Sequence, residues 1–151
     1  MNRVVTGYDE DGNPVVIRQG EPPVVIHAGR YTTTELWVSE RGPIVAADID
    51  ASTREWALEP PPGGACFRIV EIAPGPGGGP GTQHAEFQGA HATDTLDYVT
   101  VLSGEVTLVV GDTEVTLGPG DSVVQQPAVP HDWQNRSSEP AVMVGVLVSA
   151  R

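Results

Sequence analysis

The sequence predicts an all-β fold, a sandwich or barrel, and two observations carry this prediction. The 151 residues include 18 glycines and 14 prolines, which divide the chain into short pieces. Many of these pieces are rich in valine, isoleucine and threonine, which favour strands. About ten short strands separated by turn residues are typical of sandwiches and barrels. Because the chain shows no internal repeat and is short, we expect one structural domain.

The N-terminal region, residues 1–65, is expected to add strands and a long surface loop to the barrel. β-branched runs predict strands at 3–8, 14–18, 24–27 and 33–38, the first two forming a hairpin around the turn residues 9–13. Ser52 and Glu55 have the spacing of a capping box. This spacing predicts one or two helical turns that run to about Leu58, before three prolines end them.

Residues 66–151 are expected to form the barrel core. Strands are predicted at 66–73, 96–102, 105–110, 113–117, 122–126, 131–136 and 141–149. The glycine-rich segment 74–81 does not fit a phosphate-binding loop, because neither a helix nor a lysine follows it. We therefore expect no nucleotide cofactor.

Composition excludes several classes of function. The eight basic residues are all arginine, which rules out lysine Schiff bases and a P-loop lysine. A formal net charge of −12 disfavours binding to nucleic acid or to anionic membranes. The single cysteine, Cys66, cannot form an internal disulfide or a cysteine-based zinc cluster. With no signal-like N-terminus and no long apolar run, the expected location is the cytoplasm.

Polar residues that share strand faces with apolar residues mark the candidate site. In a strand, residues of one parity point to one face, so His91, Thr93 and Asp97 should lie together with Val99 and Val101. The same parity rule groups three residues of a later segment, which are His131, Trp133 and Asn135. Ionisable groups in apolar surroundings are costly unless they are paired, hydrogen-bonded or bound to metal. The grouping therefore predicts a functional site.

Two imidazoles and one carboxylate leave two kinds of chemistry open. His91, Asp97 and His131 match the ligand types of a facial-triad Fe(II) site, and they would also suit Zn, Mn or Ni. Without a metal, Asp97 would orient one of the histidines as a general base. His84 and Glu86 precede this group and could supply a further ligand or proton carrier.

The two segments resemble the paired motifs of the cupin superfamily. His91-x-Thr93, three residues, Asp97, six residues and Gly104 is similar to the first motif, and Gly120 to Asn135 is similar to the second. The chain departs from the family pattern at Thr93, which replaces a histidine, and at Asp97, which replaces a glutamate. Pro127 is displaced by one position and the internal glycine of the second motif is missing.

The resemblance implies a double-stranded β-helix, or jelly-roll, barrel with extra N-terminal strands, acting on a small organic metabolite. It allows metal-assisted oxygenase, decarboxylase, isomerase, cyclase or lyase chemistry. A non-catalytic small-molecule binder and a metal-free lyase or isomerase are the alternatives. The catalytic candidates are His91, Asp97, His131 and Glu86; the first three are the candidate metal ligands, and His84, Thr93, Trp133 and Asn135 are the supporting residues.

Three further expectations complete the sequence analysis. The resemblance implies a homodimer in which the N-terminal strands cross over, because an unpaired sheet edge invites association. Cys66 is expected to be a buried structural residue rather than a nucleophile. Arg68 is expected to form an outward surface salt bridge, with binding of a substrate carboxylate as the alternative if it faces inward.

Overall fold

A computed structural model describes residues 1–40, 55–75 and 89–151. The all-β prediction is confirmed: these residues form eleven strands and contain no helix. The strands are β1 (Arg3–Tyr8), β2 (Pro14–Gly20), β3 (Val24–Ala28), β4 (Tyr31–Ser39), β5 (Ala65–Ile72), β6 (Thr95–Ser103), β7 (Val106–Val110), β8 (Thr113–Leu117), β9 (Ser122–Gln125), β10 (Asp132–Gln134) and β11 (Ala141–Ser149).

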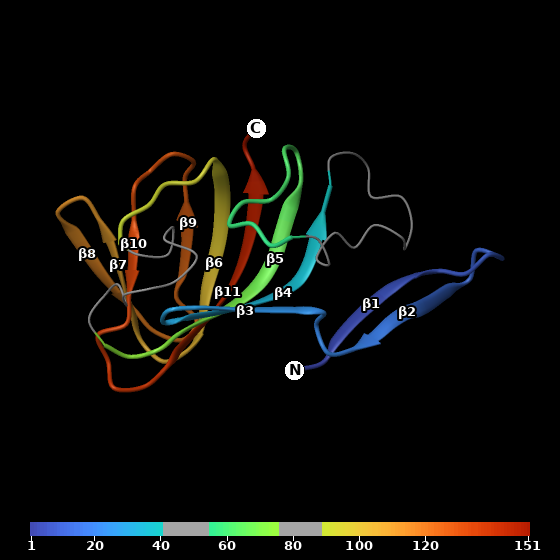
Figure 1. Cartoon of the computed structure of the whole chain (residues 1–151), viewed down its shortest axis with the longest axis horizontal. Helices are drawn as coiled ribbons and strands as arrows, with labels where there is room; N and C mark the ends of the chain where they lie inside the picture. Colours follow the sequence, from blue (N-terminus) through green and yellow to red (C-terminus); the bar gives the residue numbers. More distant parts are fainter. Residues whose placement is uncertain (41–54, 76–88) are drawn as a thin grey trace.

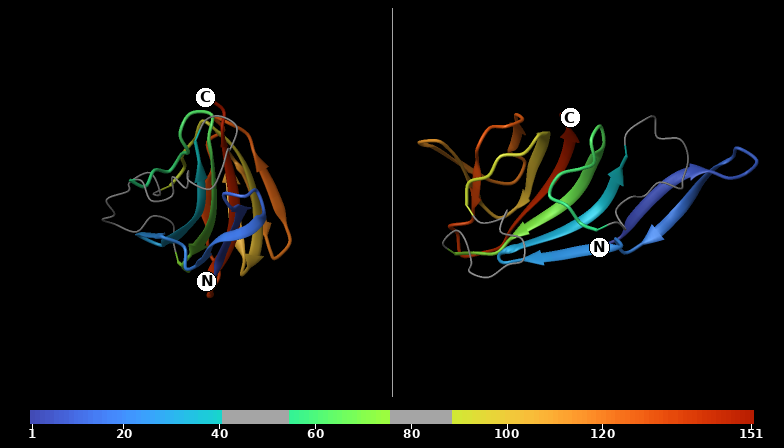
Figure 2. Two further views of the ribbon diagram at one scale, coloured as in Figure 1. Left: turned by 90° about the vertical axis from the view of Figure 1, so that its right-hand side faces the viewer. Right: turned by 45° about the horizontal axis from the view of Figure 1, so that its top comes forward.

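Two antiparallel sheets build the barrel. The larger sheet has six strands in the order β3-β4-β5-β11-β6-β9, and the smaller sheet has three strands in the order β10-β7-β8. The six-stranded sheet curves through the middle of the molecule, and the smaller sheet lies at one side of it (Figures 1 and 2). Non-consecutive neighbours such as β11 between β5 and β6 show that strands distant in sequence are paired, as in a jelly roll.

The central strand β11 shows why this sequence separates an inside from an outside. Met143, Gly145 and Leu147 alternate with valines, and every second residue is buried. Because side chains alternate between the two faces of a strand, these residues face the barrel interior and the valines face outward. The interior core consists of Ile72, Val101, Val106, Leu108, Leu117, Ala141 and Met143.

The N-terminal hairpin stands apart from the barrel. Strands β1 and β2 pair only with each other among the described residues, whereas β3 and β4 belong to the main sheet. The hairpin projects from the barrel with its turn at the far end (Figure 1). At its base, Arg3 Nη1 donates to the Leu36 carbonyl at 2.9 Å. The hairpin expected at 3–18 is therefore present as a projecting arm.

The helical turns expected from Ser52 to Leu58 have a mixed outcome. Residues 52–54 lie outside the described residues, and residues 55–58 are not helical. Arg68 donates to the carbonyls of Ala57 and Leu58. These two carbonyls therefore accept hydrogen bonds from a side chain and not from the backbone N–H groups of a helix. In the part of the chain that the structure describes, no helix is long and apolar enough to cross a membrane.

Candidate functional site

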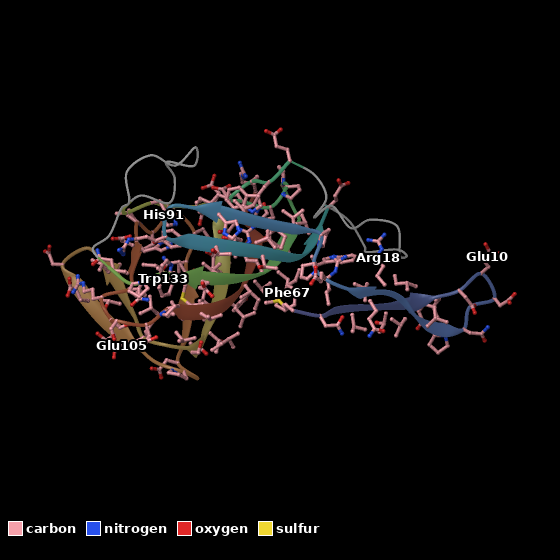
Figure 3. The ribbon with its side chains drawn as sticks, turned by 60° about the horizontal axis from the view of Figure 1, so that its bottom comes forward. Glu10, Arg18, Phe67, His91, Glu105 and Trp133 are labelled. Atoms are coloured by element: carbon pink, nitrogen blue, oxygen red, sulfur yellow. The ribbon has the colours of Figure 1, made fainter. Side chains whose placement is uncertain are left out.

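A cavity of about 80 Å³ lies in the barrel interior, where the two predicted segments meet. Strands β4, β5, β6, β10 and β11 contribute to its wall, and His91 and Trp133 lie in this part of the molecule (Figure 3). The lining residues are Tyr31, Thr33, Leu58, Arg68, Val70, His91, Thr93, Asp97, Val99, His131, Trp133, Met143, Gly145 and Leu147. The cavity is thus mostly apolar with a few polar groups, as small-molecule sites are.

His91 and His131 are held side by side by their backbones. They form an isolated antiparallel bridge, in which each backbone N–H donates to the other residue's carbonyl at 2.9 Å. Their ring centroids lie 4.6 Å apart, with 54° between the ring planes. The backbone bridge therefore brings together two histidines that are forty positions apart in sequence.

Backbone carbonyls select the tautomer of both histidines. The Nδ1 atom of His131 lies 3.0 Å from the Val129 carbonyl, and that of His91 lies 3.4 Å from the Gly89 carbonyl. A carbonyl can only accept a hydrogen bond, so each Nδ1 carries the proton in the neutral ring. Each Nε2 is then the unprotonated nitrogen, which can accept a proton or coordinate a ligand.

Burial keeps His91 in its neutral form. Burial and then the neighbouring His131 lower the pKa of His91 below its ordinary value of 6.5. Removing the ring from water disfavours the charged imidazolium, and a second positive ring nearby would repel it. A neutral imidazole with a free Nε2 has the form that a general base needs.

Asp97 carries a buried carboxyl oxygen in the cavity wall that lacks a hydrogen-bond partner among the described residues. Its side chain is 7% exposed, and Oδ1 has no hydrogen-bond partner among the described residues. Burial raises the pKa of Asp97 above its ordinary value of 3.8, against smaller lowering contributions from Thr95, His131, Arg68 and His91. A buried carboxyl oxygen without a partner costs free energy, and a ligand or a proton would remove that cost.

Trp133 and Tyr31 form one aromatic side of the cavity. The indole meets the His131 ring edge-on at a centroid distance of 6.2 Å, a favourable aromatic geometry. The Tyr31 hydroxyl donates to the Trp133 carbonyl at 2.8 Å and so ties β4 to β10. Burial raises the pKa of Tyr31 to about 12, which keeps this hydroxyl a neutral donor.

The predicted three-ligand metal site is not assembled by the described residues alone. Within 1–40, 55–75 and 89–151, no three His, Cys, Asp or Glu side chains are grouped so that they could hold a metal ion. His91 and His131 form a pair, and Thr93 supplies a hydroxyl where the cupin pattern has a histidine. A further ligand would have to come from elsewhere, and the candidates His84 and Glu86 lie outside the described residues. The residues present therefore do not fit a metal of the expected kind by themselves.

Asn135 lies outside the cavity lining and is fully buried in the hydrogen-bonded network beside it. Its Nδ2 donates to the carbonyls of Ile72 and Glu139, both at 2.8 Å. Its Oδ1 accepts from the backbone N–H of Ser137 at 3.0 Å and from its hydroxyl at 2.8 Å. The side chain thus joins the end of β5 to the turn before β11.

The expectation that Arg68 points outward is wrong. Arg68 is 2% exposed, lines the cavity and pairs with the buried Glu35, with Nε and Oε1 2.6 Å apart. Parity in β5 could have indicated this, because Arg68 shares a face with Cys66 and Val70. Cys66 is buried, as expected, and burial raises the pKa of its thiol to about 11, so it is a poor nucleophile.

Ala128 stands at the position where the second cupin motif has its internal glycine. With Gly120 as the start, the family's glycine falls at position 128, where Ala128 has a φ of 61°. This left-handed conformation is easy for glycine and strained for alanine. The Ala128 N–H donates to the Thr93 carbonyl at 2.9 Å and so links the two motifs.

Other cavity residues were not predicted from the sequence. Tyr31, Thr33 and Leu58 come from the N-terminal region, which was expected to pack on the barrel. Gly145 comes from the predicted strand 141–149, to which no site residue was assigned. The parity of β11 would have placed Met143, Gly145 and Leu147 on one face, but the strands opposite them could not be read from the chain. The wall of the cavity depends on pairing between distant strands.

Fold and motifs together define a cupin, and the comparisons with known proteins give the family. A model of the Cupin domain family (Cupin_2) matches residues 68–148, so the chain belongs to this family. Two curated relatives from Diaporthe leptostromiformis, phomopsin biosynthesis cluster proteins C′ and D, are each 31% identical over 145 residues. Each alignment covers 90% of this chain and 71% of the relative.

Solved structures share the fold at low sequence identity. The polyketide cyclase RemF from Streptomyces resistomycificus matches with a TM-score of 0.54 and 15% identity, over 87% of this chain and 70% of that one. A cupin superfamily protein from Desulfitobacterium hafniense matches with a TM-score of 0.53 and 11% identity, over 83% and 84% of the two chains. DMSP lyase DddQ from Ruegeria pomeroyi has a TM-score of 0.52 and 17% identity, over 80% of this chain and 47% of that one. These likenesses concern the fold alone.

Proposed function

We propose that this cupin is an enzyme that moves a proton on a small organic metabolite, as a lyase, isomerase or cyclase does. The observation that carries the proposal is the pairing of a neutral imidazole, His91, with a buried carboxyl oxygen without a partner, on Asp97, in one mostly apolar cavity. Burial lowers the pKa of His91 and raises that of Asp97, so both shifts favour the neutral forms, a free imidazole base and a protonated carboxyl. The relatives named for a biosynthesis cluster support a role in small-molecule metabolism.

The proposed mechanism uses His91 as the base and Asp97 as the acid. The Nε2 of His91 takes a proton from an acidic carbon of the substrate. In its protonated form, which burial favours, Asp97 donates a hydrogen bond to the oxygen on which negative charge develops. His131 holds the substrate beside His91 through its own Nε2, and Trp133 closes this side of the cavity. The apolar wall excludes water and strengthens each of these interactions.

Exchange of carbon-bound protons tests the mechanism before the natural substrate is known. In D₂O, the protein should accelerate loss of the α-proton NMR signals of small ketones such as cyclopentanone. His91→Ala should lower this rate by about 10²–10⁴-fold, the usual contribution of a general base. Ketone binding, followed by NMR titration, should change by less than about threefold, since the base acts mainly in the transition state.

His27→Ala provides the matched control for this experiment. His27 is an exposed histidine on β3 whose Nδ1 lies 3.0 Å from the Thr32 hydroxyl, away from the cavity. This variant should exchange protons at the parental rate. A parent protein that binds ketones without accelerating exchange would contradict the acid–base mechanism and would favour the alternative function, a non-catalytic binder of small molecules.

Metal binding stays a prediction, and it has a separate test. Elemental analysis of untagged protein purified without chelators should find little Fe, Zn, Mn or Ni if the proton-transfer site is metal-free. Near-stoichiometric metal that is lost in both His91→Ala and His131→Ala would contradict the metal-free mechanism. His84→Ala and Glu86→Ala would then identify the missing ligand.

We also propose that the protein is a homodimer formed through the hairpin arm. An isolated two-stranded hairpin is at best marginally stable in water, and this arm exposes Val4 (52%) and Val16 (55%). The outer face of the main sheet also exposes Phe67, Tyr98 and Val124, which lie in one row across the sheet. A second copy would cover both apolar surfaces through one two-fold axis.

Light scattering after size exclusion measures this association. The parent should have twice the 15.9 kDa mass of one chain. The double variant Val4→Lys/Val16→Lys should be monomeric, because two lysines cannot be buried without partners. Val115→Lys, at an exposed position of β8, is the matched control and should remain dimeric. A monomeric parent at high concentration would contradict the proposal.

A further inference from the structure

Gly145 occupies an unusual position in the central strand. It lies in the middle of β11, between Val144 and Val146, on the face that carries Met143 and Leu147 into the cavity. Glycine in a strand interior costs about 0.5–1 kcal/mol relative to alanine, because it loses more freedom and packs no side chain. It commonly marks a bulge or a place where a ligand or another backbone approaches closely.

Neither the backbone nor the packing of this protein requires glycine at position 145. Gly145 does not have the left-handed φ that favours glycine, and β11 pairs without a bulge at this residue. An added Cβ would lie 3.5 Å from Leu147 Cδ1 and 3.9 Å from Val99 Cγ2, both ordinary contacts. Gly104 is different, since it has a φ of 74° and an added Cβ would collide with the Pro140 carbonyl.

The space over Gly145 lies beside the proposed acid. Gly145 pairs with Arg68 on β5 and with Val99 on β6, and the next inward residue of β11, Leu147, pairs with Asp97. The cavity measures about 80 Å³. An added Cβ at position 145 would take up part of this space.

We propose that Gly145 sets the size of the substrate: the place of its missing side chain holds the compact apolar part of the ligand next to the reacting carbon. This inference rests on the proposed function, which needs a small organic ligand in the same cavity. It assigns the substrate to compact molecules with a carbon portion about the size of a small ring. A bulkier residue at 145 removes that space while it leaves His91 and Asp97 in place.

A pair of ligands that differ by one methylene tests the assignment. Dissociation constants for cyclopentanone and cyclohexanone are measured by NMR titration for the parent and for Gly145→Ala. The variant should lose cyclohexanone binding at least tenfold more than cyclopentanone binding, since one misfitting methylene is worth about 10–200-fold. The melting temperature should be unchanged or higher, because alanine is more stable than glycine in a strand.

Gly118→Ala is the matched control. Gly118 lies outside the cavity, and an added Cβ would meet nothing within 4 Å, so both constants should keep their parental values. Equal losses for the two ketones in Gly145→Ala, or no loss, would overturn the role of Gly145. Because binding is measured without turnover, ketones that bind but exchange no protons would contradict the acid–base mechanism alone. If the parent binds neither ketone, this inference is overturned as well.

Discussion

Two buried polar clusters in the barrel interior differ in how completely they are bonded. In the first, Arg68 and Glu35 form a two-contact ion pair, with Nε–Oε1 at 2.6 Å and Nη2–Oε2 at 3.2 Å. Arg68 also donates to the Leu58 carbonyl at 2.9 Å. In the second, and within the part of the chain that the structure describes, His91 and His131 form side-chain hydrogen bonds through Nδ1 alone and Asp97 Oδ1 has no partner.

The difference indicates a structural role for the Arg68–Glu35 pair, and it supports the proposed role of His91, His131 and Asp97 in ligand chemistry. The buried Arg68 is paired with its counter-charge Glu35, and it joins strands β4 and β5 to residues 57–58 without needing a ligand. A buried group with spare hydrogen-bonding capacity is costly to the fold, and its cost falls when a ligand arrives. Both clusters line or border the same space, so burial alone does not distinguish them; the spare hydrogen-bonding capacity of the second cluster is what supports its proposed role.

The largest expected loss of stability comes from breaking the buried ion pair between Arg68 and Glu35. Arg68→Met leaves Glu35 buried without its partner, and removal of one member of a buried ion pair typically costs about 3–5 kcal/mol. Urea denaturation should detect this loss in the free energy of unfolding. Arg136→Met, which removes the exposed ion pair with Glu114, should leave the unfolding midpoint unchanged. A small effect of Arg68→Met would mean that the pair does not hold β4 and β5.

Combining two substitutions sharpens the first prediction. Glu35→Leu/Arg68→Met removes both charges, and an apolar replacement of a buried pair is often neutral or stabilising. The double variant should therefore be more stable than Arg68→Met alone. It should also loosen residues 57–58, where Leu58 lines the cavity, and so weaken ketone binding.

The second prediction concerns Asn135, which the sequence grouped with the site. Asn135→Ala removes four hydrogen bonds and leaves buried carbonyls unpaired, so it should cost about 1–3 kcal/mol of stability. Its proton-exchange rate should stay at the parental value under conditions where the variant is folded. A variant that loses exchange but keeps its stability would place Asn135 in the catalytic site.

The sequence was sufficient to locate strands, because strand formation depends on local patterns, and the motif resemblance supplied the barrel. Alternation and turn residues located the strands, and β1, β8 and β11 have the predicted bounds. The motif spacing brought His91 and His131 together, and the structure pairs them directly.

The remaining cavity residues depend on which strands are neighbours, and this information is not local. Arg68 was assigned outward because surface salt bridges are the commoner role of arginine, and its buried partner Glu35 is 33 positions away and reaches it only through the β4–β5 register. Gly145 was overlooked for the same reason, since its meaning depends on Arg68 and Val99 on either side of it. The candidate residues could be chosen from the sequence by residue type, but their hydrogen-bond partners could not be predicted, because these depend on which strands pair.

The third prediction uses pH to measure how much the buried carboxyl of Asp97 lowers the free energy of unfolding. Burial raises the pKa of Asp97 above 3.8, so between that value and the raised value the folded state keeps a proton that the unfolded state has lost. Asp97 therefore lowers stability as the pH rises through this window. Asp97→Asn removes the titrating group and should melt above the parent at pH 7, by calorimetry, with the difference shrinking toward pH 4. Its proton-exchange activity should fall.

His91→Ala is the matched comparison for Asp97→Asn, because the pKa of His91 is lowered whereas that of Asp97 is raised. A lowered histidine pKa means that the unfolded state binds the extra proton below pH 6.5, so His91 costs stability on the acid side. The stability gain of His91→Ala should hence appear toward lower pH, where that of Asp97→Asn disappears. Equal pH dependence of the two variants would contradict the assigned shifts.

The smallest expected effect concerns the loop that joins the two motifs. Ala128 has a φ of 61°, a conformation that costs an L-residue roughly 1–2 kcal/mol, while glycine adds flexibility to the unfolded chain. Ala128→Gly should therefore raise the free energy of unfolding by about 0.5–1 kcal/mol, measured by urea denaturation. Ala73→Gly, at the end of β5 without a left-handed φ, should destabilise instead. Stabilisation at 128 without loss of proton exchange would show that the strain belongs to the loop alone; a loss of exchange would show that the strained loop positions His131.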